Sequence, residues 1–132
     1  MDYKSSIADY TKAIGLKPDA ADAYHNRGLA KAILKDYEGA KADYTKLIEL
    51  DPDVSDAYNH RGYTKAILED YEGAIKDYTK AIELNSNYAD FYHNRGVAKD
   101  SLSDNRGACA DWRIAASMGN TNAKESVANY CN

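Results

Sequence analysis

The chain has 132 residues, of which 44% are hydrophobic and 29% charged, and its formal charge is -4 at pH 7. This length allows one compact unit or one short repeat array rather than two domains. The acidic balance, with no run of consecutive Lys or Arg, removes the usual electrostatic driving force for binding nucleic acid or an anionic membrane. A non-acidic partner is favoured instead.

The sequence has no membrane or export signature. No stretch approaches the roughly 18 to 20 consecutive apolar residues of a membrane helix, and the polar segment from Met1 to Tyr10 has no apolar signal core. We therefore expect a soluble chain without a membrane partner. A cytoplasmic location is favoured, and an extracytoplasmic one stays open if a signal peptide has been removed.

Residues 1–20 predict a single helix, because Ile7, Tyr10 and Ile14 recur at three- and four-residue steps. From there on the chain repeats itself. The segment Ala-Tyr-His-Asn-Arg-Gly that begins at Ala23 returns, with small changes, 34 residues later and again after a further 34. A period of this length is typical of helical solenoids.

Each repeat predicts two helices, because small and apolar residues recur at three- and four-residue steps in both halves. Polar side chains that can accept hydrogen bonds from a first helical turn precede every one of these helices. We expect the caps of the first helices to be Asp19, Asp53 and Asn87, and those of the second helices to be Asp36, Asp70 and Asp104.

The 34-residue period, with an aromatic residue at Tyr24, glycine at Gly28, alanine at Ala40, tyrosine at Tyr44 and proline at Pro52, resembles the tetratricopeptide-repeat (TPR) pattern. The resemblance implies an all-α, right-handed superhelix of antiparallel helix pairs that forms a single domain over residues 1–132. Its parts would be the second helix of a partial repeat (1–20), three full repeats (21–54, 55–88 and 89–122) and a capping helix (121–132).

The third repeat departs from the other two, with Asn105 in the place of Tyr71 and Trp112 in the place of Tyr78. Terminal repeats of solenoids are often atypical. Residues that occupy the same position in successive repeats form what we call a column. Because Trp112 falls in the column of the expected core tyrosines, we interpret it as a core anchor against the last helix rather than a ligand platform.

Three periodic columns predict how the two helices of each repeat meet. The glycines leave room where the first helix approaches the second. The arginine before each glycine stands where the family usually has an aliphatic residue, so we expect it to pair with an aspartate of a neighbouring helix and set the register. The alternative is that each arginine reaches solvent independently. The columns are Gly28, Gly62 and Gly96; Arg27, Arg61 and Arg95; and Asp9, Asp43, Asp77 and Asp111.

Catalytic signatures are missing from the sequence: it has no nucleophile turn, no glycine-rich phosphate loop before a lysine and no His-Glu-x-x-His. His25, His60 and His93 lie one repeat apart and suggest a metal site. Because packed helix axes are about 8 to 10 Å apart, His25 and His93 are too distant for one ion. We therefore interpret the histidines as exposed polar residues of a groove, and we expect no enzymatic activity, metal or cofactor.

The resemblance implies that a ligand lies along the concave face formed by the first helices. Amides, imidazoles and short aliphatic side chains there suit a peptide, and the alternative is that they merely keep the inner surface wet. The columns are Asp22, Asp56 and Asp90; His25, Asn59 and His93; Asn26, His60 and Asn94; Leu29, Tyr63 and Val97; and Ile33, Ile67 and Ser101.

Some TPR modules hold the carboxylate of a chaperone C-terminal tail in a clamp of Lys, Asn and Arg residues. At those positions this chain has His25, Leu29, His60, Asp90 and Asn94, of which none agrees from the first full repeat onward. Shifted by one repeat, only Asn94 and Lys124 agree. Chaperone tails are therefore not the expected ligand.

The two ends of the array carry separate predictions. Cys109 and Cys131 fall on consecutive helices, so we expect them within bonding reach, with two free thiols as the alternative. At the N-terminus part of the apolar stripe of the first helix would be uncovered. Either this helix mediates self-association into a homo-oligomer, or it frays on a monomer. A self-associating scaffold, or a piece of a longer array, is the alternative to a peptide-binding module.

Overall fold

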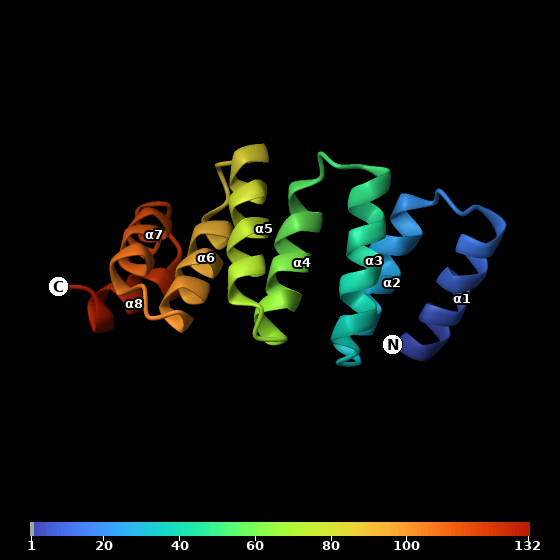
Figure 1. Cartoon of the computed structure of the whole chain (residues 1–132), viewed down its shortest axis with the longest axis horizontal. Coiled ribbons are helices and arrows are strands. Elements are labelled where there is room, and N and C mark those ends of the chain that lie inside the picture. The colour runs from blue at the N-terminus through green and yellow to red at the C-terminus, as the bar shows by residue number, and fades with distance from the viewer. Residues whose placement is uncertain (1) are drawn as a thin grey trace.

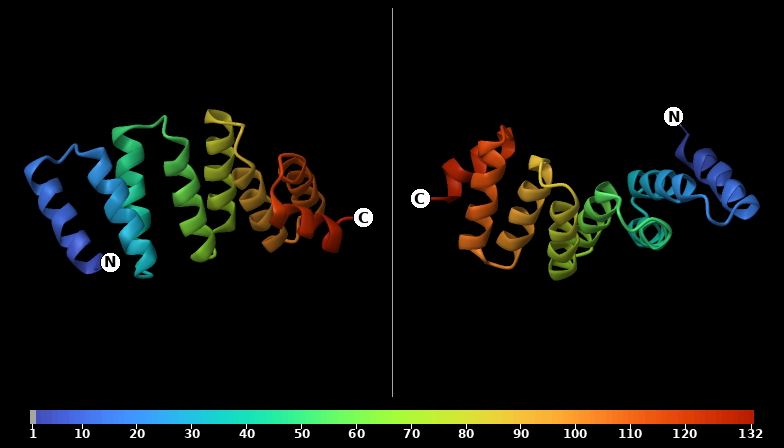
Figure 2. Two further views of the ribbon diagram at one scale, coloured as in Figure 1. Left: turned by 180° about the vertical axis from the view of Figure 1, so that it is seen from behind. Right: turned by 90° about the horizontal axis from the view of Figure 1, so that it is seen from above.

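The structure is a computed structural model that describes residues 2–132, and over these residues it is all helical, as the sequence predicts. Each helix packs against the next one along the chain, and the array extends from one terminus to the other along the long axis of the molecule (Figure 1). The direction of the helices changes along the array (Figure 2). The helices are α1 (Tyr3–Leu16), α2 (Ala21–Ile33), α3 (Tyr37–Leu50), α4 (Ser55–Ile67), α5 (Tyr71–Leu84), α6 (Ala89–Ser101), α7 (Asn105–Ser117) and α8 (Thr121–Tyr130).

The second helix of each repeat begins at an aspartate cap. The side chains of Asp36, Asp70 and Asp104 accept hydrogen bonds from the backbone amides three residues later, at 3.0, 3.0 and 2.9 Å. These bonds satisfy amides that have no partner within the helix. The three caps expected at these positions are thus present.

The caps expected for the first helices are wrong. The residues immediately before α2, α4 and α6 are Ala20, Val54 and Tyr88, and none of these helices has a side-chain cap. The predicted polar residue stands one position too early in each case, so its oxygen is not where the free amides of the first turn can reach it. The mispredicted caps are Asp19, Asp53 and Asn87.

The turn inside each repeat contains a residue in the left-handed region. Lys35, Glu69 and Ser103 have φ values of 65°, 66° and 65°. The next amide then reaches back to the preceding helix, as in the 2.8 Å bond from Asp36 to the carbonyl of Lys31. This closure reverses the chain within few residues, so the two helices of a repeat pack directly together.

The core is a row of aromatic rings between paired helices. Tyr44, Tyr78 and Phe91 are almost fully buried. Gly28, Gly62 and Gly96 of the first helices each face an aromatic ring of the second helix in the same repeat, which is Tyr44, Tyr78 or Trp112. A Cβ added at Gly62, for example, would lie 3.0 Å from the Tyr78 ring. The expected room for close helix approach at the glycines is therefore filled by the aromatic side chain of the second helix.

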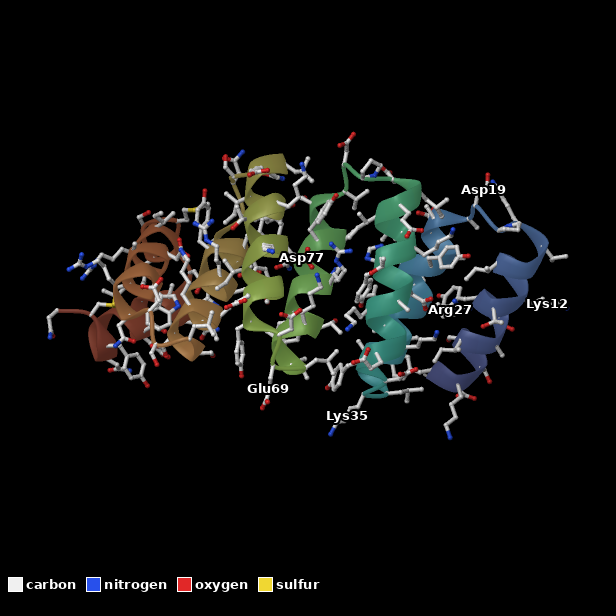
Figure 3. The ribbon with its side chains drawn as sticks, in the orientation of Figure 1. Lys12, Asp19, Arg27, Lys35, Glu69 and Asp77 are labelled. Carbon is white, nitrogen blue, oxygen red and sulfur yellow. A yellow bond between two sulfur atoms is a disulfide. The ribbon has the colours of Figure 1, made fainter. Side chains whose placement is uncertain are left out.

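The C-terminal end is closed by α8, which packs on α7. Trp112 is 3% exposed, and its ring lies 6.1 Å from that of Tyr130. Cys109 in α7 and Cys131 just after α8 are joined by a disulfide, with their α carbons 5.8 Å apart (Figure 3). Both the tryptophan and the disulfide hold α8 against the last repeat.

The N-terminal end is less covered. Tyr3, Ile7, Tyr10 and Ile14 are half-buried, and α1 contains no fully buried residue. Leu16, at the end of α1, is 81% exposed. None of the helices formed by residues 2–132 combines the length and apolarity needed to cross a membrane.

Candidate binding groove

Equivalent pockets open where one repeat meets the next. The first lies between α1 and α2 and has a volume of about 150 Å³. The second lies among α2, α3 and α4, with about 310 Å³, and the third among α4, α5 and α6, with about 370 Å³. Neighbouring pockets share walls: Leu29 and Ile33 line the first two, and Tyr63 and Ile67 line the last two. Together these three pockets form one continuous groove, which we call the groove from here on.

The same six columns line all three pockets, and three of these six columns belong to the set predicted from the sequence. From the first helices come the predicted columns that begin at Asn26, Leu29 and Ile33, together with the column of Ala30. From the second helices come two tyrosine columns that sequence analysis did not assign to the groove. These are Tyr3, Tyr37 and Tyr71, and Tyr10, Tyr44 and Tyr78. Their 34-residue spacing was a signal that could have found them.

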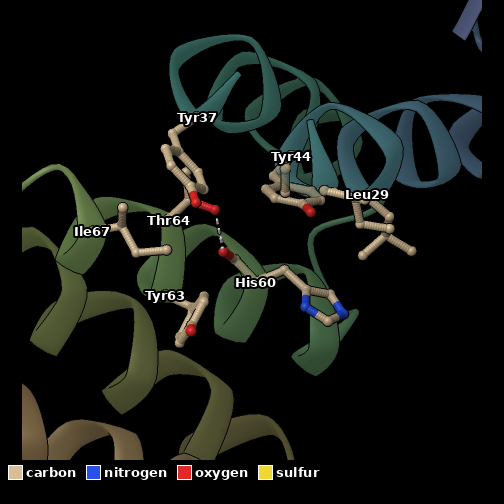
Figure 4. Close-up of a pocket in the computed structure, with 9 residues that line it drawn as sticks. Leu29, Tyr37, Tyr44, His60, Tyr63, Thr64 and Ile67 are labelled. Carbon is tan, nitrogen blue, oxygen red and sulfur yellow. Dashed lines mark hydrogen bonds between the residues drawn. The ribbon is translucent and has the colours of Figure 1, made fainter. Parts of the chain in front are cut away.

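The second pocket shows how the side chains are arranged (Figure 4). Tyr63 is 56% exposed and Ile67 38% exposed, so large apolar surfaces of α4 face water. Tyr44 is buried, and this burial raises the pKa of its hydroxyl to about 12. Thr64 donates a 2.8 Å hydrogen bond to the carbonyl of His60 and so has no free donor for a ligand. The pocket is therefore mainly apolar.

His25 and His60 form a ring pair between the first two full repeats. Their centroids lie 5.4 Å apart, and the His60 ring stacks on Tyr44 at 5.7 Å. Burial, and secondarily His25, lower the pKa of His60, while Asp56 opposes that shift. The expectation of separately exposed histidines is wrong for this pair: both are half-buried and in contact, because the columns of residues 25 and 60 are adjacent on facing helices.

At the junction between the second and third full repeats, asparagine side chains occupy the two positions that correspond to His25 and His60. Asn94 donates a 3.2 Å hydrogen bond to Asn59, the residue that corresponds to His25. His93 lines the third pocket, and none of the ring contacts found within residues 2–132 includes it. Over residues 2–132 no three His, Cys, Asp or Glu side chains are grouped so as to hold a metal ion.

The arginine column ties three helices together. Arg27 donates hydrogen bonds to both carboxylate oxygens of Asp43, at 2.9 and 2.7 Å, and a third, at 3.2 Å, to Thr11 on the preceding helix. Arg61 and Arg95 repeat this arrangement with Asp77 and Asp111. The pairing raises the pKa of each arginine. These side chains therefore have a structural position behind the groove.

Asp9 does not join this ladder, contrary to the expectation. It is exposed on α1, and no ion pair in the part of the chain that the structure describes includes it. The remaining predicted column, Asp22, Asp56 and Asp90, is exposed in the first turns of α2, α4 and α6. The one hydrogen bond found there is a 3.0 Å bond from Asn120 to Asp90.

Sequence comparison matches most of the helical array to known repeats. The family described as TPR repeat matches residues 2–34 and 66–99, and the family described as tetratricopeptide repeat matches residues 21–54. The chain belongs to the tetratricopeptide-repeat family. TPR domains generally mediate protein–protein interactions, and the fold of this family is a non-enzymatic interaction fold.

Solved TPR structures share the fold. A crystal structure of the MamA protein superposes with a TM-score of 0.91 at 24% identity, covering 96% of this chain and 70% of that one. The Arabidopsis OM64 TPR domain gives 0.81 at 27% identity, with coverages of 84% and 93%. The first TPR of Spaghetti (RPAP3), bound to the HSP90 peptide SRMEEVD, gives 0.80 at 23%, with coverages of 83% and 89%. No curated protein matches the chain in sequence.

Proposed function

We propose that the chain is a protein-interaction module that binds a peptide, or an extended segment of a partner protein, along the groove. The observation that carries this proposal is the repetition of one mainly apolar pocket at three successive junctions. Ile33, Tyr63 and Val97 are 54%, 56% and 44% exposed on its walls. Large apolar side chains that gather in water on one surface are typical of a binding site.

The groove does not suit a C-terminal carboxylate. No lysine or arginine lines any of the three pockets among residues 2–132, and the clamp positions include Asp90, which would repel an anion. The HSP90 peptide SRMEEVD is the ligand of the Spaghetti domain, with which this chain shares 23% identity. We therefore propose a ligand that binds through internal side chains rather than through its C-terminus.

A peptide-library binding experiment tests the proposal. Tyr63→Ala removes a wall shared by two pockets, and we expect it to weaken the selected peptides by roughly tenfold, because a buried aromatic contact contributes over 1 kcal/mol. The matched control is Tyr88→Ala, which removes a tyrosine of nearly equal exposure, 53%, that lines none of the three pockets. Peptides whose affinity is insensitive to Tyr63→Ala and to Val97→Ala would contradict binding in the groove.

A self-associating scaffold is the second candidate, and α1 favours it. Its apolar stripe is covered on one side by α2 and stays half-exposed at Ile7 and Ile14. Sedimentation over a wide concentration range tests this role. A dimer that is lost in Ile7→Lys would support it, whereas a chain that stays monomeric at high concentration would exclude it.

A further inference from the structure

We infer that the groove selects a cationic segment that carries bulky apolar side chains, and this inference rests on the proposed function. The apolar part follows from the three pockets. The cationic part follows from Asp22, Asp56 and Asp90, which are exposed one turn before the pocket-lining residues Asn26, His60 and Asn94. Because side chains four residues apart lie on one helix face, these carboxylates stand along the edge of the groove.

Within residues 2–132, no lysine or arginine forms an ion pair with these carboxylates. The lysines and arginines closest to them in sequence on the same helices, such as Lys65 and Arg61, are held by the buried Asp77 on the other side of α4. Among the ion pairs found in residues 2–132, none includes Asp22, Asp56 or Asp90. The groove edge therefore carries one carboxylate per repeat that has no ion-pair partner, and of the three only Asp90 accepts a side-chain hydrogen bond within residues 2–132, from Asn120.

The fourth junction adds a further acidic side chain at the C-terminal end of the array. A cavity of about 290 Å³ among α6, α7 and α8 is lined by Asp100 and Asn105, where the third pocket has Ala66 and Tyr71. Tyr130, 70% exposed, also lines this cavity. This fourth cavity shares no lining residue with the groove, and it has an acidic side chain, Asp100, where the three pockets of the groove have none. A carboxylate beside an aromatic ring suits a guanidinium or ammonium group.

The occupant is therefore a peptide whose apolar side chains enter the first three pockets and whose basic residues lie along the aspartate edge and at the α6–α8 end. Burial of the apolar side chains supplies most of the affinity. The exposed charges supply selectivity and a salt-dependent association rate.

Three synthetic peptides of equal length test the inference by fluorescence anisotropy. The first combines Leu and Phe with Lys and Arg, the second replaces the basic residues by Glu, and the third replaces the apolar residues by Ser. We expect the first to bind at least about tenfold more tightly than either of the others at low salt, and its advantage over the Glu peptide to shrink as salt is raised.

The variant pair Asp56→Asn with Asp100→Asn removes one charge at the groove edge and one in the α6–α8 cavity. It should weaken the basic peptide by roughly fivefold, as expected for two exposed ion pairs. The matched control, Asp19→Asn with Asp53→Asn, makes the same change of net charge in the turns before α2 and α4 and should leave binding unchanged. Equal losses in both variants would overturn the inference, because they would show attraction to the overall charge alone.

Failure of the inference and failure of the proposed function are distinguishable. If the Glu peptide binds as tightly as the basic one and both are weakened by Tyr63→Ala, the groove binds peptides but the charge preference is wrong. If no peptide is weakened by Tyr63→Ala, both the inference and the proposed groove are wrong.

Discussion

Arg61 donates two parallel hydrogen bonds, each 2.8 Å long, to the two carboxylate oxygens of Asp77, which is 4% exposed. A third bond of 3.4 Å reaches Thr45 on α3, and Lys65 approaches the same carboxylate at 3.1 Å. One arginine of α4 is thereby bonded to the second helix of its own repeat and to that of the preceding repeat. The fork geometry of a guanidinium makes this possible, whereas a lysine could not copy it.

We predict that Asp77→Ala lowers the free energy of unfolding by about 3 kcal/mol, because it leaves two cations without their partner. Arg61→Ala should cost less, since Lys65 still pairs with Asp77. Urea denaturation measures both. Asp9→Ala is the control, because Asp9 occupies the same column but is exposed, and its effect should stay within about 0.5 kcal/mol. Equal losses at Asp9 and Asp77 would contradict the role of the ladder.

Glycine substitutions test the close approach of paired helices. A Cβ added at Gly96 would lie 2.6 Å from the Trp112 ring and 3.1 Å from the carbonyl oxygen of Ala108. Because Trp112 is buried and a backbone atom cannot yield, we expect Gly96→Ala to destabilise the chain by about 1 to 3 kcal/mol. Gly15→Ala meets nothing within 4 Å and should be neutral or stabilise α1 by up to about 1 kcal/mol. Thermal unfolding of the two variants decides this.

The His25–His60 pair predicts a pH-dependent stability. Because burial holds the pKa of folded His60 below its ordinary value of 6.5, the unfolded chain binds the proton more readily between these two values. The stability contribution is therefore fully present above about pH 6.5 and is lost as the pH falls toward the lowered pKa. For one proton the slope cannot exceed about 1.4 kcal/mol per pH unit.

The control for this prediction is supplied by the chain itself. The double variant His25→Asn with His60→Asn copies the hydrogen-bonded pair Asn59 and Asn94 of the next junction. Urea denaturation between pH 5 and 8 should show a flatter profile for this variant than for the parent. An unchanged profile would mean that the pH dependence arises elsewhere.

Reduction of the Cys109–Cys131 disulfide should destabilise the C-terminal end. The bond joins residues 22 positions apart. Closing a loop of this size constrains the unfolded chain by about 3 kcal/mol. We expect Cys131→Ser, or addition of a reductant, to lower the unfolding temperature and to change the fluorescence of Trp112, which packs beside Tyr130. Two free thiols in air-exposed protein, counted under denaturing conditions, would contradict the bond.

Several contacts could be predicted from the sequence, because each joins residues on helices one or two apart in an array whose period is constant. Helix pairs follow from the 34-residue period, and the meeting of Arg27 with Asp43 follows from two columns that recur together on neighbouring helices. Capping of the first helices was mispredicted, since a shift of one residue, from Asp19 to Ala20, decides whether an oxygen reaches the first turn. Sequence periodicity does not resolve a helix boundary to one residue.

The sequence alone determined the family, the all-α class and the order of the helices. The 34-residue period indicates the family, and the three- and four-residue steps within each repeat indicate where the helices lie and which side of each is apolar. Only the tertiary structure decided what those helices form together. It placed Tyr37 and Tyr71 of the second helices in the groove, brought His60 against His25, and left Asp9 without an arginine. The physical reason is that a pocket or a ring pair depends on the angle and offset between neighbouring helices. Those quantities are set by the packing of bulky side chains such as Tyr44 and Tyr78 against glycines, and no one helix contains that information.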